Sequence, residues 1–258
     1  MLVIDDLSAS FRRYNGLFRQ DFITRLSNIT LTIQAGEIVA LVGHSGAGKS
    51  LLAHAILGLL PANAIATGTV SFEGQLLNQH NLVEHRGRNI ALLPQQTSYL
   101  DPTANVGALV RWAALRGGKP LEIKNRLNRV GLSDDVAQLF PHQLSGGMAR
   151  RVLMAQATSG GAKLLIADEP TAGLDPANRD IVLKHLRAHA DNGGAALLIT
   201  HDLIPVLSYA DRIAMLKDGQ LCCVAPTSSF SGTGEMLASP YAKSLWRALP
   251  QNDFYAYA

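Results

Sequence analysis

Residues 43–50 of the chain read Gly43-His44-Ser45-Gly46-Ala47-Gly48-Lys49-Ser50. This run matches the phosphate-loop pattern G-x-x-x-x-G-K-[ST] at every fixed position. It follows the continuous apolar run Ile38–Val42, which is typical of a strand buried on both faces, and it opens a helix predicted at 49–60. A strand, a glycine-rich loop and a helix in this order predict an α/β core that binds phosphate. A chance glycine turn is a poor alternative in this context.

The residue types of the loop suit a nucleotide phosphate. Glycines let the backbone wrap closely around an anion and point its N–H groups inward. The helix N-terminus adds a positive partial charge. Lys49 would place its ammonium on the β- and γ-phosphates, and Ser50 would offer a hydroxyl to Mg²⁺.

A second candidate site feature is an apolar strand, predicted at 164–167, that ends in Asp168 and Glu169. A charge near a core is costly, so paired carboxylates at this place suggest a use. Asp168 would hold Mg²⁺ through water, and Glu169 would polarise the water that attacks the γ-phosphate. Taken alone, a solvated strand end explains the pair equally well. Beside a phosphate loop the functional interpretation is favoured.

Residues 144–148 read Leu-Ser-Gly-Gly-Met and come just before a helix predicted at 149–158. Ser145, Gly146 and Gly147 could form a second helix start that binds an anion. Alone, an ordinary N-cap and loop explains these residues better. In combination with the phosphate loop, the pattern becomes informative.

Strands alternate with helices over much of the chain, which favours a mostly parallel sheet. Residues 103–160 differ, because apolar spacings of three and four predict successive helices there. We predict strands at 2–11, 29–33, 38–42, 69–72, 90–93, 164–167, 195–200, 213–216 and 220–224. We predict helices at 49–60, 106–116, 121–132, 149–158, 178–190 and 202–210, with Pro61 ending the first.

Composition narrows the class of protein. With 47% hydrophobic and 17% charged residues among 258, the chain is not expected to be disordered. Its two cysteines, Cys222 and Cys223, exclude a disulfide framework and a four-thiolate metal site within one chain. A net charge of +3 gives no argument for nucleic acid. With no apolar run of ~18 residues and no signal-peptide pattern at the N-terminus, we expect a soluble, cytoplasmic chain that could still dock on a membrane protein.

Along nearly its whole length the chain resembles an ATP-binding-cassette (ABC) ATPase subunit. Six motifs carry the resemblance, in order: Walker A at 43–50, the Q-loop Gln95, the signature at 144–148, Walker B at 164–169 with its catalytic glutamate, the D-loop Leu174-Asp175, and the switch residue His201. Two positions depart from the common pattern. Met148 stands where most of the superfamily has Gln, and Gly173 where Ala is common; the phosphate-contacting Ser and Gly residues are intact.

The resemblance implies ATP and Mg²⁺ as cofactors, and it implies a role for each matching residue. His201 would contact the γ-phosphate. Without the other motifs, an ordinary histidine at the start of a helix would be the better interpretation of this residue. Phe11 would stack on adenine, with Tyr14 as the next choice and a plain core role for Phe11 left open. The implied catalytic residues are Glu169, His201, Gln95 and Lys49. The implied nucleotide contacts are Gly43, His44, Ser45, Gly46, Ala47, Gly48, Lys49, Ser50, Phe11, Ser145, Gly146, Gly147 and Asp175, and the implied metal contacts are Ser50, Gln95 and Asp168.

The implied fold is an α/β P-loop NTPase (RecA-like) core with an N-terminal antiparallel β-subdomain and an inserted α-helical signature subdomain. The expected segments are 1–94 for the β-subdomain and the first part of the core, and 95–160 for the Q-loop and helical subdomain. Residues 161–225 would complete the core, and 226–258 would form a C-terminal tail.

Within the family, the chain resembles the dipeptide/oligopeptide/nickel importer group. The similarity lies in Tyr99-Leu100-Asp101-Pro102 after Gln95, in Phe140-Pro141-His142-Gln143 before the signature, and in Pro240-Tyr241-Ala242-Lys243-Ser244-Leu245. Peptide members often carry a longer C-terminal extension with a cysteine cluster. Its absence here favours the nickel or metal–metallophore subgroup.

The expected function is therefore ATP hydrolysis in the ATPase subunit of an ABC importer for nickel, metal–metallophore or peptide substrates. The implied partners are a second ATPase subunit encoded by a different gene, two membrane permease subunits and, indirectly, a substrate-binding protein, with no nucleic acid. The chain would lie peripherally on the cytoplasmic face of the inner membrane. Two alternatives stay open: the ATPase subunit of an exporter, and a soluble ABC ATPase that takes no part in transport.

Two further patterns carry little weight. His185 and His189 have the i, i+4 spacing of metal ligands, but a solvated helix face explains them better. Cys222 and Cys223 are adjacent on a predicted strand, so their side chains should point in opposite directions, and we interpret them as packing residues.

Overall fold

The N-terminal segment alternates apolar and polar residues and forms a long antiparallel hairpin in the computed structural model, which describes residues 1–15 and 19–249. The chain divides into two compact units. The first comprises residues 1–33, 38–77 and the part from 201 onward, and the second comprises 34–37 and 78–200. The four-segment division expected from the sequence stays a prediction.

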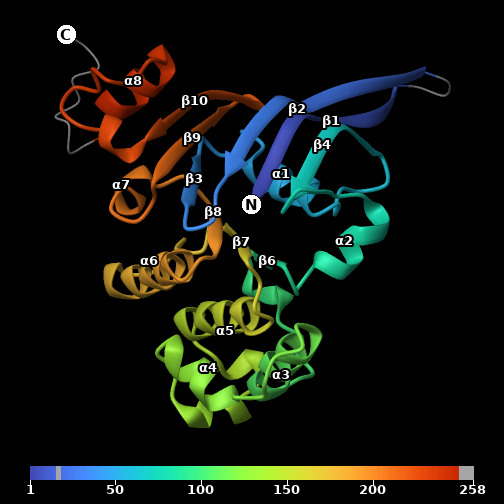
Figure 1. Cartoon of the computed structure of the whole chain (residues 1–258), viewed down its shortest axis with the longest axis vertical. Coiled ribbons are helices and arrows are strands. Elements are labelled where there is room, and N and C mark those ends of the chain that lie inside the picture. The colour runs from blue at the N-terminus through green and yellow to red at the C-terminus, as the bar shows by residue number, and fades with distance from the viewer. Residues whose placement is uncertain (16–18, 250–258) are drawn as a thin grey trace. The chain divides into compact units, whose positions relative to one another are not determined.

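The first unit contains a four-stranded antiparallel sheet in the order β2-β1-β4-β5 (Figure 1). Its strands are β1 (Leu2–Asn15), β2 (Arg19–Ile33), β4 (Ala64–Phe72) and β5 (Gln75–Leu76). The predicted strands at 2–11 and 29–33 are too short. The polar stretch between them continues the hairpin, with Phe11 opposite Ile23 and Arg12 opposite Phe22. Ladder hydrogen bonds between backbones do not require apolar side chains, so hydropathy misses this extension.

The same unit contains three strands in the order β10-β9-β3. They are β3 (Ile38–Val42), β9 (Arg212–Lys217) and β10 (Gln220–Pro226). β3 pairs parallel to β9, and β9 pairs antiparallel to β10. Every residue of β3 is buried, as its continuous apolar run predicts.

Helix α1 (Lys49–Ile56) follows the phosphate loop and is shorter than predicted. Pro61 does not end it. Gly58 has φ +60° and donates to Ala55 O, while Leu59 donates to His54 O, which is a Schellman motif that closes the helix before the proline.

In the second unit, three parallel strands lie in the order β8-β7-β6. They are β6 (Ile90–Leu93), β7 (Leu164–Asp168) and β8 (Ala195–Thr200), and α6 (Pro176–Asp191) connects β7 to β8. Between β6 and β7 the chain forms α3 (Val106–Arg116), α4 (Ile123–Arg129) and α5 (Gly146–Ser159), which lie against one another (Figure 1). An antiparallel N-terminal sheet, parallel strands and inserted helices confirm the predicted fold class.

Short elements complete the fold. Helix α2 (Gln79–His85) is not predicted from the sequence, and neither is α8 (Pro240–Arg247), whose Trp246 ring packs edge-on against Phe230. Helix α7 (Leu203–Val206) covers only part of the predicted 202–210 and continues to Ala210 as hydrogen-bonded turns. Single 3-10 turns lie at Thr97–Tyr99, Asp134–Gln138, Pro141–Gln143 and Thr227–Ser229. The end of the predicted tail, residues 250–258, lies outside the described residues. Of the helices described, none has the length and apolar character that crossing a membrane requires.

Candidate functional site

The phosphate loop lies between β3 and α1, and its backbone requires glycine at particular positions. Gly46 and Gly48 have φ values of +83° and +106°, which side chains rarely tolerate. A Cβ on Gly43 would lie 2.3 Å from the Leu216 backbone oxygen, and a Cβ on Gly48 would lie 2.9 Å from Leu26 Cδ2. A Cβ on Gly46 would meet nothing within 4 Å. The two fixed glycines, Gly43 and Gly48, therefore allow close packing, and Gly46, at a variable position of the pattern, allows a positive φ in open space.

Lys49 is buried, with 7% of its surface exposed, and its ammonium folds over the loop. Its Nζ donates to Gly43 O at 2.7 Å and to His44 O at 3.2 Å. Ser50 follows in the first turn of α1 and is half-buried. An ammonium, a hydroxyl and the N–H groups of a helix start form a donor set that fits a phosphate group.

The acidic strand end lies in the second unit. Asp168 is the last residue of β7, and Asp168 and Glu169 are 6% and 7% exposed. Glu169 has φ +48°, a left-handed conformation that is uncommon for a residue with a side chain. Its N–H donates to Ile199 O at 2.9 Å. Buried carboxylates at the carboxyl end of parallel strands are typical of a site rather than of packing.

The donor chemistry also fits Mg²⁺ at the predicted metal contacts. Ser50, Gln95 and Asp168 offer one hydroxyl, one amide oxygen and one carboxylate. In residues 1–15 and 19–249 no cluster of three or more His, Cys, Asp or Glu side chains could hold a metal ion. Each of these oxygens is a ligand type that Mg²⁺ accepts, and Mg²⁺ binds through few protein ligands together with waters and substrate phosphates.

The Ser-Gly-Gly run starts α5 directly instead of preceding it, so the predicted start at 149 is wrong by three residues. Ser145 is the N-cap, and its Oγ accepts a hydrogen bond from Met148 N–H at 3.3 Å. Gly146 and Gly147 form the first turn, where a Cβ on Gly146 would meet nothing within 4 Å. Ser145 and Gly146 are exposed. Their backbone donors are therefore accessible at the positive end of a helix of 14 residues.

The remaining predicted site residues are distributed over both units. Gln95 is exposed just beyond β6 in the second unit. In that unit Asp175 caps α6, accepting from Asn178 N–H at 3.0 Å and from its Nδ2 at 2.6 Å, and these bonds lower the pKa of the Asp175 carboxyl. His201 is exposed directly after β8 and is grouped with the first unit.

The two candidates for stacking on adenine lie on β1. Phe11 is half-buried, whereas the side chain of Tyr14 lies outside the described part of the chain.

The β9–β10 turn contacts and supports the phosphate loop. This contact is not predicted from the sequence. Gly219 donates its N–H to Ala47 O at 3.0 Å, and its own carbonyl accepts from Ser27 N–H at 2.9 Å. Asp218 lies beside His44, with 3.4 Å between Oδ1 and Nε2. An Asp-Gly pair predicts a hairpin turn, but no local signal indicates which loop that turn will contact.

Neither of the two weaker patterns forms a site. Burial lowers the pKa of His185 and of His189, and His189 Nε2 lies 3.1 Å from Lys163 O. Burial raises the pKa of both cysteine thiols, and Cys222 Sγ donates to Met215 O. All four side chains are half-buried, so the interpretation of His185 and His189 as a solvated helix face is wrong.

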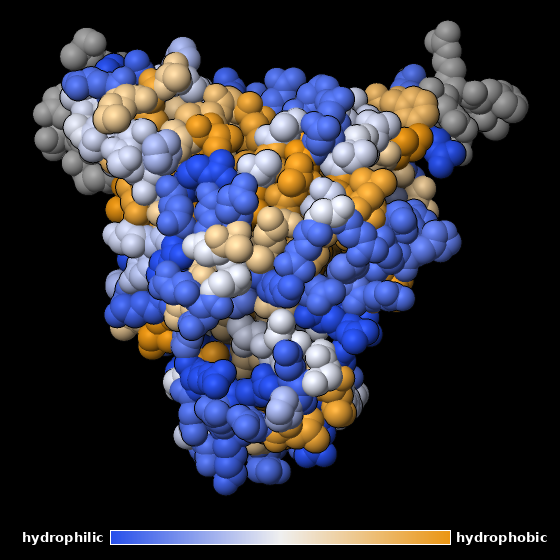
Figure 2. Space-filling view, viewed as in Figure 1, coloured by the Kyte–Doolittle hydropathy of each residue, from blue (hydrophilic) through white to orange (hydrophobic). Residues whose placement is uncertain are grey.

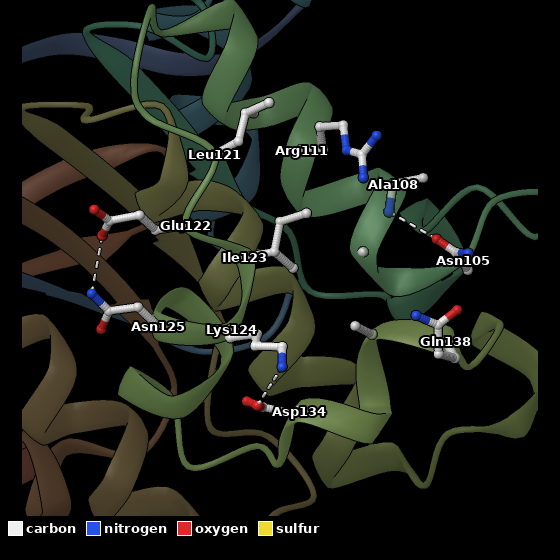
Figure 3. Close-up of a pocket in the computed structure, with 12 residues that line it drawn as sticks. Asn105, Ala108, Arg111, Leu121, Glu122, Ile123, Lys124, Asn125, Asp134 and Gln138 are labelled. Atoms are coloured by element: carbon white, nitrogen blue, oxygen red, sulfur yellow. Dashed lines mark hydrogen bonds and ion pairs between the residues drawn. The ribbon is translucent and has the colours of Figure 1, made fainter.

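A cavity of about 730 Å³ opens among α3, α4 and the turn at Asp134–Gln138 (Figure 3). None of the predicted site residues lines it. Several of its polar side chains have partners: Lys124 pairs with Asp134 at 3.3 Å, Asn125 donates to Glu122 at 3.1 Å, and Asn105 accepts from Ala108 N–H at the start of α3. This cavity is separate from the nucleotide chemistry predicted for the chain.

Comparisons with known proteins agree with these observations. The sequence profile of the family described as "ABC transporter" matches residues 26–172. The chain is 35% identical to the dipeptide transport ATP-binding protein DppD of Escherichia coli, over 97% of this chain and 79% of that protein. It is 34% identical to the metal-staphylopine import system ATP-binding protein CntD of Staphylococcus aureus, over 76% of this chain and 77% of that protein. The solved dimeric ATP-binding cassette MJ0796, in a post-hydrolysis state with ADP and Pi, aligns with a TM-score of 0.76 at 26% identity, over 88% of this chain and 99% of that chain.

Proposed function

Because the chain belongs to the ABC transporter family of ATPases, we propose that it powers an importer for peptides or metal–metallophore complexes. Family membership confirms the resemblance drawn from the six motifs, and with it ATP as the nucleotide and hydrolysis coupled to transport. The observation that carries the proposal is the phosphate loop with its buried Lys49. The substrate class is supported by the two relatives, one named for dipeptide transport and one for metal-staphylopine import.

The proposal assigns a role to each part of the site. Lys49 and the amides of residues 43–50 bind the β- and γ-phosphates of ATP, and the start of α5 binds the γ-phosphate of a nucleotide on a partner subunit. Glu169 orients and deprotonates the attacking water. Mg²⁺, held by Ser50, Gln95 and Asp168, would offset negative charge on the phosphates. His201 would contact the γ-phosphate, and Phe11 would stack on adenine.

Uptake measurements test the substrate class. A strain that lacks the gene would be assayed with labelled nickel and with a labelled dipeptide, and then complemented with the wild-type chain or with Lys49→Ala. We expect one of the two uptakes to fall and to recover only with the wild type. Unchanged uptake of both would contradict the proposed importer role.

The proposed partners are two permease subunits, a second and different ATPase chain and, through the permease, a substrate-binding protein at the cytoplasmic face of the membrane. A groove in the second unit supports a permease contact. It has a volume of about 370 Å³ and is lined by residues that include Leu92, Pro94, Tyr99 and Trp112. Tyr99 and Trp112 are 64% and 51% exposed. Apolar surface is visible over the helical insert near α3 (Figure 2), and exposed aromatic side chains beside a groove are typical of interaction sites.

Trp112→Glu tests this groove. A charge there should abolish co-purification with the permease and therefore transport. Removing an aromatic side chain that is buried at an interface lowers the binding free energy by about 2 kcal/mol or more. ATP binding by the variant should be unchanged, because Trp112 lies outside the phosphate loop. Leu121→Glu is the matched control, being 50% exposed on the same unit but outside the groove. Equal loss of assembly in both variants would argue against the groove.

Met148 tests how the signature works. Its contribution to the helix start is a backbone N–H bonded to Ser145 Oγ, which does not depend on its side chain. Met148→Gln should therefore change ATPase activity by less than about tenfold, or ~1.4 kcal/mol. Ser145→Arg removes the cap and fills the exposed helix start, and should reduce activity by about a hundredfold or more. Equal, large losses in steady-state ATPase assays would reveal a role for the Met148 side chain.

A further inference from the structure

Arg150 lies in α5 and contacts the predicted catalytic glutamate. Its Nη1 donates to the backbone oxygen of Glu169 at 2.9 Å. Leu93, Pro94 and Pro170 lie close around this contact. Burial lowers the pKa of the Arg150 guanidinium, and the Glu169 charge opposes that shift. Removing a guanidinium from water costs free energy, so a partly buried arginine requires a compensating interaction with the protein.

The backbone of Glu169 needs external support. A side-chain-bearing residue held at φ +48° is in a strained backbone conformation, which persists only where its surroundings fix it. The Glu169 N–H donates to Ile199 O at 2.9 Å, and the Glu169 oxygen accepts from Ala172 N–H at 3.2 Å as well as from Arg150. Arg150 therefore adds a side-chain hydrogen bond to this backbone unit.

The same helix carries the signature residues. Ser145 caps α5, and Arg150 follows within the second turn. The adjacent Arg151 contacts other residues. Its Nη1 donates to Gly131 O at 2.7 Å, and its Nε donates to Gly147 O at 3.3 Å. Of two consecutive arginines, one therefore supports the helical insert and the other supports the end of β7.

We propose that Arg150 is a positioning residue for ATP hydrolysis, fixing the main chain of Glu169 and thus the direction of its carboxylate. Because Arg150 is part of α5, it also ties the geometry of Glu169 to the helix that begins with the signature. A displacement of α5 would then change the orientation of the glutamate. The inference rests on the proposed function, since it requires Glu169 to act on the attacking water.

The test compares Arg150→Gln and Arg150→Lys in the subunit assembled with its partner chains. Arg150→Gln should lower kcat about tenfold while KM for ATP stays within about twofold, because the lost contact acts on the hydrolysis step and not on binding. Lys retains a charged donor and should recover much of the lost rate. Arg126→Gln is the matched control, because Arg126 is also partly buried and donates to two backbone oxygens, of Ser159 at 2.9 Å and of Pro120 at 3.0 Å. It should lower Tm without lowering kcat.

A double variant separates positioning from general structural support. If Arg150 acts through Glu169, then adding Arg150→Gln to Glu169→Gln should lower the residual hydrolysis little further, because the two effects are not additive. A full additional tenfold loss, a wild-type kcat in Arg150→Gln, or an equal kcat loss in Arg126→Gln would overturn the inference. If Glu169→Gln alone hydrolyses ATP normally, the failure lies instead in the proposed role of Glu169.

Discussion

Lys49→Ala is expected to lose nucleotide binding and ATP turnover together. The Lys49 ammonium is buried and already directed over the loop by its bonds to Gly43 O and His44 O, so it needs little reorganisation to meet a phosphate. A point charge on the β- and γ-phosphates stabilises both the bound nucleotide and the transition state. We expect kcat to fall by on the order of 10²–10³ and ATP affinity to fall with it.

Equilibrium binding of a fluorescent ATP analogue and steady-state hydrolysis would measure the two effects separately. Lys184→Ala provides the same chemical change on an exposed ammonium that pairs with Asp180 on α6, and it should leave both quantities unchanged. A thermal melt of Lys49→Ala would show whether loss of the two carbonyl contacts also destabilises the loop. Hydrolysis at the parental rate by Lys49→Ala would mean that residues 43–50 do not bind the triphosphate.

Continuous apolar runs with clear boundaries could be located from the sequence. β3, β6 and β8 begin and end where predicted, because each is a buried parallel strand whose apolar run stops at polar or glycine-containing turns. The phosphate loop and the Asp168-Glu169 pair were recognisable for a related reason. The residues of each motif are separated by a short, fixed number of positions, so the whole pattern can be read from a short stretch of sequence.

Features that depend on distant contacts could not be predicted. The outer part of the β1–β2 hairpin is held by backbone pairing between polar segments, and α1 ends at a Schellman glycine that lies ahead of the more obvious proline. The contact between Arg150 and Glu169 joins residues 19 apart, and the contact of His44 with Asp218 joins the loop to a turn far along the chain. Neither contact leaves a periodic or spaced pattern in the sequence.

Glu169→Gln is expected to reduce ATP hydrolysis by roughly 10²–10⁴ while ATP binding survives. In the proposed role, the Glu169 charge orients and deprotonates the water. The substitution removes that charge and keeps the length of the side chain. The backbone contacts of Glu169 with Ile199, Ala172 and Arg150 involve main-chain atoms and should persist. The left-handed conformation at this position is therefore expected to be unchanged in the variant.

A variant that binds ATP without consuming it should accumulate as an ATP-bound dimer, with itself or with its partner ATPase. In the proposed shared site, the accessible start of α5 at Ser145 and Gly146 binds a phosphate presented by another subunit, and in this variant that phosphate would stay in place. Size-exclusion runs with and without Mg-ATP should show a dimer that dissociates when ATP is withdrawn. Glu122→Gln, the same change at an exposed residue before α4, should neither slow hydrolysis nor stabilise a dimer. If Glu169→Gln stays strictly monomeric with ATP and the partner ATPase supplied, the shared site between two subunits is wrong, whatever its hydrolysis rate.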